Sequence, residues 1–367
     1  MPRWRPATPT WYACAVPAPT DSRERPNLEQ VARVAGVSRA TVSRVVNGLT
    51  SVDPVLRTRV ERAIEELGYT PNLAARTLVT RRTDTIALVA SEPDVRVFGD
   101  PFFGGIVRGV SQECMAAGLQ MLMLMAQSFE DLDRIEKYLR TAAVDGVLLI
   151  SEHAEKDPLP SALRRSSVPY VIGGRPLAPD PGARYVDNDN VGGAVLAVEH
   201  LLGLGRTVVG TVAGPRDMAA GIDRLAGFRT ALGPRFRARR VETSNFTQQG
   251  GELATQRLLE RVPDLDGLFV ASDLMAIGAL RALARAGRRV PDDVAVVGFD
   301  DIDAAAFSEP ALTTVRQETT LQGRAMVRLL LAQYRPDTDP APVAGLPDLR
   351  EDDHLVLPVR LVVRDSA

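Results

Sequence analysis

One short stretch of this sequence carries side chains that could read a nucleic acid. On a helix, Ala40, Arg44 and Asn47 fall four and three residues apart and share a face, with Arg39 and Ser43 beside them. Two guanidinium groups, a methyl group and small polar side chains suit the base edges and phosphates of a DNA major groove. The solvated face of an ordinary helical hairpin looks the same, so the interpretation needs support from the surrounding residues.

The residues around this stretch predict the elements that would position it. Gly36 can adopt the positive φ that ends a helix, and Ser38 is a favourable N-cap for the next one. Both helices also have apolar residues at helical spacing, which would face a shared core: Leu28, Val31, Ala32 and Ala35 on the first, and Val42, Val45 and Val46 on the second. Two helices joined by a tight turn predict a helix-turn-helix.

A third helix would complete a small domain. Asp53 is its expected N-cap, Pro54 its first residue and Gly68 its end. Its core-facing stripe comprises Leu56, Val60, Ile64 and Leu67. We therefore predict a DNA-binding headpiece over residues 27–71.

A brief helix follows within a linker over residues 72–83. Asn72 can cap it, and residues 73–79 supply only seven positions. Helices shorter than about 12–15 residues are marginal in water, so we expect this one to order only against a surface. Leu78 is the apolar side chain that it would present there.

Charge separates the two ends of the chain. The sequence has 367 residues and a net charge of −2. Residues 1–82 hold 13 Arg against 7 Asp and Glu, a balance of +6 that leaves −8 for the remainder. A basic end on an acidic body indicates a polyanionic partner for that end alone. Apolar residues make up 45% of the chain, enough for sizeable cores, and no apolar run approaches the roughly 18 residues of a membrane span.

The remaining composition excludes several classes of protein. Two Cys are too few for a disulfide framework, and three His show no metal-ligand spacing. We expect no metal and no cofactor. Residues 1–26 are rich in proline and lack the apolar segment of a signal peptide, so we interpret them as a disordered tail or as an extension upstream of the true start. A cytoplasmic, nucleoid-associated protein without a membrane partner fits best.

From Thr85 onwards, apolar runs alternate with amphipathic segments. The runs predicted to be buried parallel strands are 85–90, 119–126, 146–150, 170–172, 207–213, 267–271 and 294–299. The helical segments between them include 103–117, 132–143, 191–202 and 274–286. This alternation predicts an α/β fold of doubly wound parallel sheets, and the chain is long enough for two of them.

Ligands of open α/β sheets bind beyond the carboxyl ends of the strands. The side chains near those ends that suit a small polar ligand are Phe102, Phe103, Arg224, Phe246, Ser272 and Asp300. Aromatic faces with an arginine and an aspartate could clamp a sugar, which has apolar C–H faces and hydroxyl groups. Asp300 stands out, because a carboxylate directly after an apolar strand has little structural reason to be there. We expect Asp273, beside Ser272, to be a helix N-cap rather than a ligand.

The sequence also resembles a known family. Nearly all of residues 28–367 is similar to transcription regulators of the lactose repressor/galactose repressor (LacI/GalR) family. The motifs that carry the resemblance are 31–47 (VARVAGVSRATVSRVVN), 68–72 (GYTPN), 75–78 (ARTL), 100–103 (DPFF), 199–201 (EHL), 298–301 (GFDD), 310–314 (PALTT) and 361–366 (LVVRDS). Each motif alone is weak, but together and in this order they are specific.

The resemblance implies a domain organisation. A three-helix headpiece and a hinge helix would precede a core over residues 84–367 with a periplasmic-binding-protein-like fold. The core would have an N-subdomain of about 84–188 and 319–346 and a C-subdomain of about 189–318 and 347–367. The family also implies a homodimer, with a tetramer left open, that binds a double-stranded DNA operator.

The resemblance further implies roles for individual residues. The base-reading positions would be Arg39, Ala40 and Arg44, and the phosphate contacts Ser38, Thr41, Ser43 and Asn47. Leu78 would be a wedge in the minor groove, with Ala75 and Arg76 beside it. The six residues at strand ends match effector contacts of the family. Without the family match, plain helix surface explains Thr41 and Ser43 equally well.

Some positions depart from the family pattern. Gly174 stands where an acidic residue is frequent, and Ile222 where a charged or polar one is. Ser272 replaces a larger amide or acid, and residues 92–99 lengthen the link before Pro101. These differences leave the identity of the effector open.

Three classes of function compete. A DNA-binding regulator, most simply a repressor, with a carbohydrate effector between the core subdomains explains the headpiece, hinge, charge split and core together. An extracytoplasmic solute-binding protein would have a signal peptide and no headpiece. An enzyme such as a sugar kinase would need a phosphate loop, a metal cluster or a nucleophile elbow, none of which the sequence shows. A non-sugar effector such as a nucleobase, and activation in place of repression, stay open.

Overall fold

Two units make up the chain, one over Met1–Arg81 and the other over Arg82–Ala367. The computed structural model describes residues 26–46, 51–70, 82–141, 144–151, 153, 158–177, 182–334, 343–347 and 354–367. Some predictions therefore lie outside the described residues: the tail up to residue 25, the phosphate contact Asn47, and the hinge with Ala75, Arg76 and Leu78. Within the described part, no helix is long and apolar enough to span a membrane.

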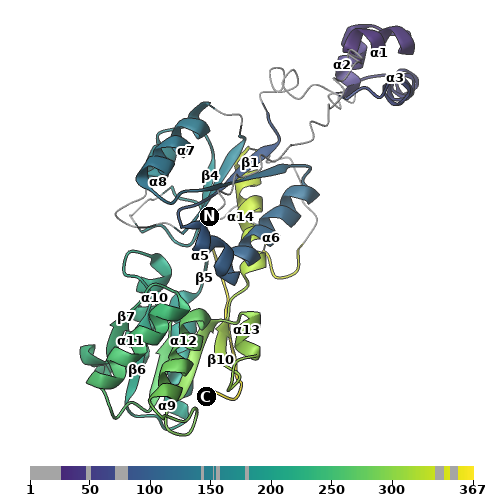
Figure 1. Ribbon diagram of the computed structural model, residues 1–367. Helices are drawn as coiled ribbons and strands as arrows, with labels where there is room; N and C mark the ends of the chain where they lie inside the picture. The colour runs from purple at the N-terminus through teal and green to yellow at the C-terminus, as the bar shows by residue number, and fades with distance from the viewer. Residues whose placement is uncertain are drawn as a thin grey trace, which may run out of the picture. The chain divides into compact units, whose positions relative to one another are not determined.

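The first unit contains the three helices that the sequence predicts. They are α1 (Leu28–Ala35), α2 (Arg39–Val46) and α3 (Pro54–Leu67) (Figure 1). The side chains of Asn27 and Asp53 accept backbone hydrogen bonds as the N-caps of α1 and α3, and Gly36 and Gly68 end these helices with a φ of 60° each. Local sequence alone therefore accounts for these boundaries.

Small apolar side chains form the core of this unit. Val31, Val42 and Val60, one from each helix, have no exposed surface, and Tyr69 closes the cluster after α3. Burial of a valine side chain contributes about 1.5–3 kcal/mol, so each of these side chains helps to hold its helix in place. The face of α2 that the sequence predicts to read DNA depends on this core, because the core fixes which face of α2 points outward.

The first sheet of the second unit is parallel throughout, with strand order β11-β5-β4-β3-β1-β2. Its strands are β1 (Thr85–Ala90), β2 (Gln120–Met125), β3 (Gly146–Ile150), β4 (Tyr170–Gly173), β5 (Tyr185–Asn188) and β11 (His354–Leu357). Its helices are α5 (Asp94–Gly99), α6 (Pro101–Ala116), α7 (Phe129–Thr141), α8 (Leu159–Arg164) and α14 (Thr319–Tyr334). We call these elements the first subdomain.

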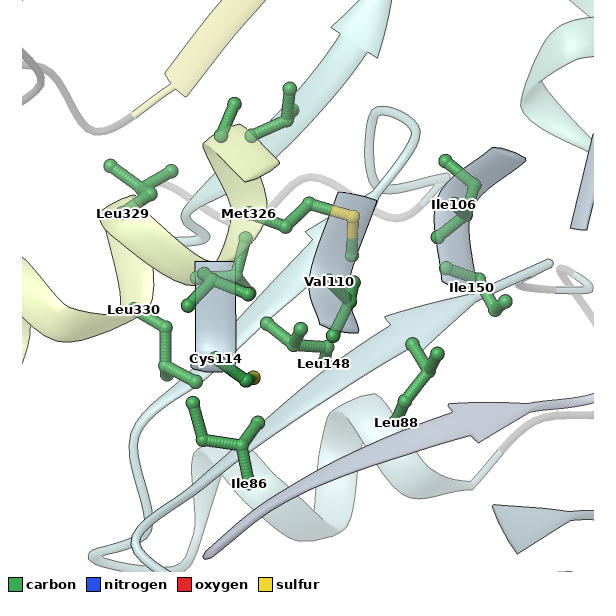
Figure 2. Packing of buried hydrophobic residues seen from close by; sticks show 14 of the residues in the cluster. Ile86, Leu88, Ile106, Val110, Cys114, Leu148, Ile150, Met326, Leu329 and Leu330 are labelled. Carbon is green, nitrogen blue, oxygen red and sulfur yellow. The ribbon is translucent and has the colours of Figure 1, made fainter. Parts of the chain in front are cut away.

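Two helices distant in sequence, α6 and α14, cover one face of this sheet. Figure 2 shows apolar side chains of these helices packed against those of the strands. The helix residues include Ile106, Val110, Cys114, Met326, Leu329 and Leu330, and the strand residues are Ile86, Leu88, Leu148 and Ile150. The helices approach closely because glycine lies at the contact. A Cβ atom on Gly109 would come within 2.0 Å of the carbonyl oxygen of Thr320.

The second sheet has the order β12-β10-β9-β8-β6-β7, with β12 antiparallel to β10 and the other pairs parallel. Its strands are β6 (Val209–Ala213), β7 (Val241–Thr243), β8 (Gly267–Val270), β9 (Ala295–Asp300), β10 (Thr313–Arg316) and β12 (Arg360–Val362). Its helices are α9 (Asn190–Gly203), α10 (Ala219–Leu232), α11 (Gln248–Arg261), α12 (Asp273–Arg285) and α13 (Asp303–Ala306). Apolar clusters fill both faces. These elements form the second subdomain.

This architecture confirms the predicted fold class, a helix-turn-helix headpiece followed by two doubly wound parallel sheets. The sequence did not single out β5, β10, β11 and β12, because strands of three or four residues with polar positions lack a clear apolar run. Residues 92–99, expected to be a longer link, contain the helix α5.

The chain passes between the two sheets three times: from β5 to α9, from β10 to α14, and from β11 to β12. The sequence places the last crossing near residue 346, and this is wrong. β11 pairs in parallel with β5, so the chain leaves the first sheet only after Leu357. A four-residue strand does not encode which sheet edge accepts it, since that depends on the edge left open by the rest of the fold.

Candidate functional site

The outward face of α2 carries the residues predicted to read bases. Arg39, Ala40 and Arg44 are exposed, while Val42 and Val45 on the opposite side are buried. Arg39 Nη1 lies 3.6 Å from Glu29 Oε1, and both side chains are 69% exposed. Such an exposed ion pair is worth little, so the guanidinium can exchange it for a ligand.

Hydrogen bonds define the turn before α2. The backbone N–H of Thr41 donates to Ser38 Oγ at 3.1 Å, as expected of an N-cap, and the two hydroxyl oxygens lie 2.9 Å apart. Arg59 of α3 donates to the carbonyl oxygen of Gly36 at 3.3 Å. Thr41 and Ser43 are half-buried. The capping of α2 is thus confirmed, and the phosphate contacts predicted for Ser38, Thr41 and Ser43 stay predictions.

A cavity of about 740 Å³, open solvent at its mouth included, lies at the carboxyl ends of strands from both subdomains. The first subdomain lines it with charged, aromatic and small side chains, including Arg96, Asp100, Phe102, Ser151, Arg175 and Asp187. The second adds Asn190, Met218, Arg224, Phe246, Ser272 and Asp300, and Gln317 and Gln322 lie on the connecting segment and α14.

Five of the six predicted effector contacts line this cavity: Phe102, Arg224, Phe246, Ser272 and Asp300. Phe103 does not line it. Its side chain is 1% exposed and belongs to the core of the first subdomain. Consecutive residues on a helix point about 100° apart, so Phe102 and Phe103 cannot both face the cavity. Their rings meet edge to face, with centroids 5.3 Å apart.

Arg224 of α10 is the most connected side chain of the cavity wall. Its Nη1 donates to the carbonyl oxygen of Ala271 at 2.6 Å and to Asp300 Oδ1 at 3.1 Å, and its Nε donates to Asn190 Oδ1 at 2.9 Å. The guanidinium carbon lies 3.7 Å from the centroid of the Phe299 ring. A buried charge with this many partners is held rigidly, which suits a group that must present hydrogen bonds to a ligand.

Burial perturbs three carboxylates of the cavity. It raises the pKa of Asp300 to about 7, against the opposing effect of the Arg224 charge and with a further increase from Asp100. Burial also raises the pKa of Asp187 to about 6, although the backbone N–H groups of Asn188 and Arg175 oppose it. Burial raises the pKa of Asp100 as well. Perturbed carboxylates gathered in one cavity indicate a functional site.

Unusual backbone conformations gather at the same place. Ser151, Phe246 and Asp300 all line the cavity and have φ values of 62°, 59° and 118°. L-residues avoid positive φ, and such strain concentrates at ligand sites. Asp300 ends β9 in this conformation, and Gln317 donates to its Oδ1 at 2.7 Å.

Asp273 does not line the cavity and is not the N-cap that the sequence predicts. Ser272 caps α12 by accepting a hydrogen bond from the backbone N–H of Met275 at 3.3 Å. Asp273 is the first residue of that helix and is fully buried, where it accepts from the backbone of Ile302 at 3.0 Å and from Thr314 Oγ1 at 2.6 Å. Its role is to connect α12 to the neighbouring strands.

Several residues that line the cavity were not predicted from the sequence. Asp187, Asn188 and Asn190 follow or end β5, a strand that the sequence did not reveal. Arg96 lies on α5, within a stretch interpreted as a link. The sequence does contain a pattern that points to Asp187, Asn188 and Asn190: the polar run 187–190 (DNDN) directly precedes a helical segment.

Gly174 and Ile222, two of the positions that depart from the family pattern, adjoin a pair of residues that joins the subdomains. Arg175 donates from Nε and Nη2 to the two carboxylate oxygens of Asp223 on α10, at 2.6 Å each. Gly174 before it has a φ of 105° and lines the cavity. Ile222, beside Asp223, is half-buried and does not line it.

Among the described residues, no group of His, Cys, Asp and Glu side chains could hold a metal ion.

Comparisons with family models match both parts of the chain. Residues 27–72 match the model described as bacterial regulatory proteins of the lacI family. Residues 198–367 match a periplasmic binding protein-like domain. These matches cover the headpiece and most of the second subdomain.

Similar proteins extend the match to nearly the whole chain. The HTH-type transcriptional regulator CelR of Thermobifida fusca is 48% identical over 350 residues, which cover 94% of this chain and 99% of CelR. A solved complex of the transcriptional regulator CelR with cellobiose has 46% identity and a TM-score of 0.72, over 94% of this chain and 100% of that one. The lac repressor dimer bound to operator and the anti-inducer ONPF has 26% identity and a TM-score of 0.78, over 94% and 99%.

Proposed function

Because the chain belongs to the LacI family of bacterial transcription regulators, we propose that it represses transcription as a dimer on a pseudo-palindromic operator and that a sugar in the core cavity releases it. The observation that carries the proposal is the cavity, where aromatic rings, paired guanidiniums and buried carboxylates meet in a chain that also has a recognition helix. Such a regulator acts on the nucleoid, in the cytoplasm.

On the DNA side, Arg39, Ala40 and Arg44 would read base edges, and Ser38, Thr41, Ser43 and Asn47 would contact phosphates. The exposure of the first three and the buried opposite face of α2 support this assignment. One recognition helix covers a half-site only, so two copies of the headpiece are needed. The similar lac repressor is a dimer on its operator, which supports the same assembly here.

On the effector side, a neutral sugar suits the lining. The three cavity guanidiniums each pair with a carboxylate: Arg96 with Glu92 at 2.7 Å, Arg175 with Asp223, and Arg224 with Asp300. Paired cations attract an anionic ligand weakly, whereas their remaining donors and the carboxylates can bind hydroxyl groups. The rings of Phe102 and Phe246 offer apolar faces for C–H groups. Cellobiose is the first candidate, since the similar CelR was solved with it.

Selection of bound sites from random duplexes tests the DNA side. We expect a pseudo-palindrome, with both half-sites protected in a footprint. Cellobiose added to the complex should then weaken operator binding roughly 5–150-fold, the usual range of coupling between two sites. A single asymmetric half-site protected by a monomer would contradict the dimer. Release by a nucleobase and not by sugars, or tighter operator binding with the ligand, would contradict sugar-induced release.

The hinge supplies a second test of the DNA side. We expect Leu78→Ala to reduce DNA bending and to weaken specific binding by about 1–3 kcal/mol, comparable to one lost base contact. The reason is that an apolar wedge unstacks a base step and kinks the duplex, with Ala75 and Arg76 close to the groove. Circular-permutation gel shifts measure the bend, and salt titrations measure nonspecific binding, which should change little. Full bending by the variant would mean that Leu78 only packs within the protein.

A further inference from the structure

One histidine joins the two subdomains beside the cavity. His153 follows β3 in the first subdomain, and its Nε2 lies 3.2 Å from Glu92 Oε1, which follows β1. Its Nδ1 lies 2.8 Å from Oδ2 of Asp217, just before α10 in the second subdomain. The neighbours Ser151 and Met218 line the cavity, so this bridge stands at its edge.

The two contacts of His153 require a particular protonation state. A neutral imidazole has one N–H, so its other nitrogen would place a lone pair opposite a carboxylate oxygen. That contact is repulsive, because neither atom can donate a hydrogen bond. The imidazolium has two N–H groups and can donate to both carboxylates in charge-assisted hydrogen bonds. The side chains of His153 and Glu92 are 21% and 4% exposed, which limits screening of their contact by water, whereas that of Asp217 is 37% exposed.

The bridge is connected to the cavity wall through other charged groups. Arg96 of α5 pairs with the same oxygen of Glu92 at 2.7 Å, and its guanidinium carbon lies 5.3 Å from the centroid of the Phe246 ring. Met218 lies next to Asp217 along the chain and directly before α10, the helix that carries Arg224. The Arg175–Asp223 pair also holds α10 to the first subdomain, but a guanidinium keeps its charge at every physiological pH.

We propose that His153 is a positioning residue for effector binding: as an imidazolium it holds the start of α10 against the first subdomain, and the effector binds less tightly once the ring loses its proton. This inference rests on the proposed function of the cavity. Effector binding would then respond to pH through one side chain that lies outside the cavity lining.

The direction of the response follows from the pairing. Hydrogen bonding to Glu92 raises the pKa of His153 above its usual value, Asp217 raises it further, and partial burial opposes both. The bridge is therefore complete below the usual value of about 6.5 and is lost as the pH rises through the raised pKa. Effector affinity should be highest in mildly acidic solution and should fall above neutrality.

Calorimetric titration of the full chain with cellobiose at about pH 6 and about pH 8.5 tests this inference. We expect affinity to fall roughly fivefold across this range in the wild type, at the low end of coupling between linked sites. His153→Lys keeps a cation at both pH values and should lose less affinity. His153→Gln should bind weakly at pH 6 already. His354→Gln is the matched control, because His354 is exposed and stacks on Tyr185, and it should behave as the wild type.

The comparison between variants is essential, because Asp187 and Asp300 in the cavity titrate in the same range. Their contribution is common to all variants, so only a difference between the wild type and His153→Lys belongs to the bridge. Equal pH profiles of these two, or wild-type affinity of His153→Gln at pH 6, would overturn the inference.

Histidine NMR separates this inference from the proposed effector. If cellobiose binds at neither pH, the effector assignment fails, and the titration of the His153 ring still decides the bridge. Its pKa should lie above the ordinary value in the wild type and return toward it in Asp217→Asn. A ring that titrates at the ordinary value in both proteins would refute the bridge.

Discussion

Replacement of Asp300 by alanine should abolish the response to the sugar and lower the free energy of unfolding of the core by about 3–5 kcal/mol. The carboxylate accepts hydrogen bonds from Arg224 and Gln317, and the Arg224 side chain is only 5% exposed. Its removal leaves a buried guanidinium without its counter-charge, which is more costly than the loss of one hydrogen bond. Sugar calorimetry and denaturant unfolding measure the two effects.

A second variant separates ligand binding from stability. Asp300→Asn keeps an oxygen acceptor for Arg224 but not the negative charge, so it should destabilise the core less than Asp300→Ala does, while sugar affinity falls roughly tenfold, as for a lost charged hydrogen bond. Asp303→Ala is the matched control, because Asp303 is exposed and lies three residues further along, and it should change neither quantity. A folded Asp300→Ala protein with wild-type sugar affinity would remove Asp300 from the effector site.

Arg44→Ala and Arg39→Ala should each weaken binding to the selected operator by about 1–3 kcal/mol. Each guanidinium is exposed on α2 and can donate two parallel hydrogen bonds to a guanine edge. Each variant should also relax the preference at one base pair, and the two base pairs should differ. Fluorescence anisotropy with a set of single-base operator variants measures both effects.

Arg62→Ala is the matched control for these variants. Arg62 lies on α3, is exposed and pairs with Glu66 four residues later, so its removal changes the charge of the headpiece equally without touching α2. We expect it to weaken all DNA sequences slightly and by the same factor. If Arg39→Ala and Arg44→Ala behave in the same uniform way, the two arginines contact phosphates and do not read bases.

The headpiece shows how much local sequence can determine. Asn27, Gly36, Asp53 and Gly68 act through neighbours no more than five residues away, so their effect on helix ends is independent of the rest of the fold. The spacing of apolar residues within each helix, such as Val42 and Val45 on α2, then decides which faces are buried. Short-range hydrogen bonding and helical periodicity thus made the three helices and the exposed face of α2 predictable.

The long parallel strands were predictable for a similar reason. Runs such as those of β1, β3 and β9 are apolar, except for one end residue each of β1 and β9, because both faces of the sheet are covered. The rule that ligands bind at the carboxyl ends of such strands then led to Phe102, Arg224, Phe246, Ser272 and Asp300. It also included Phe103, because the rule locates a segment and does not resolve which of two adjacent side chains faces the cavity.

Tertiary structure decided what depends on partners distant in the chain. The edge joined by β11, the packing of Asp273 among Ile302 and Thr314, and the bridge from Glu92 through His153 to Asp217 all join residues at least 29 positions apart. The composition and spacing of the sequence show which side chains are available. Helix caps and apolar periodicity act within one helix or strand, so they do not determine contacts between distant elements. The partners of His153 and Arg175 across the subdomains, Asp217 and Asp223, are decided only when the two subdomains meet, since those contacts form between surfaces that no local pattern describes.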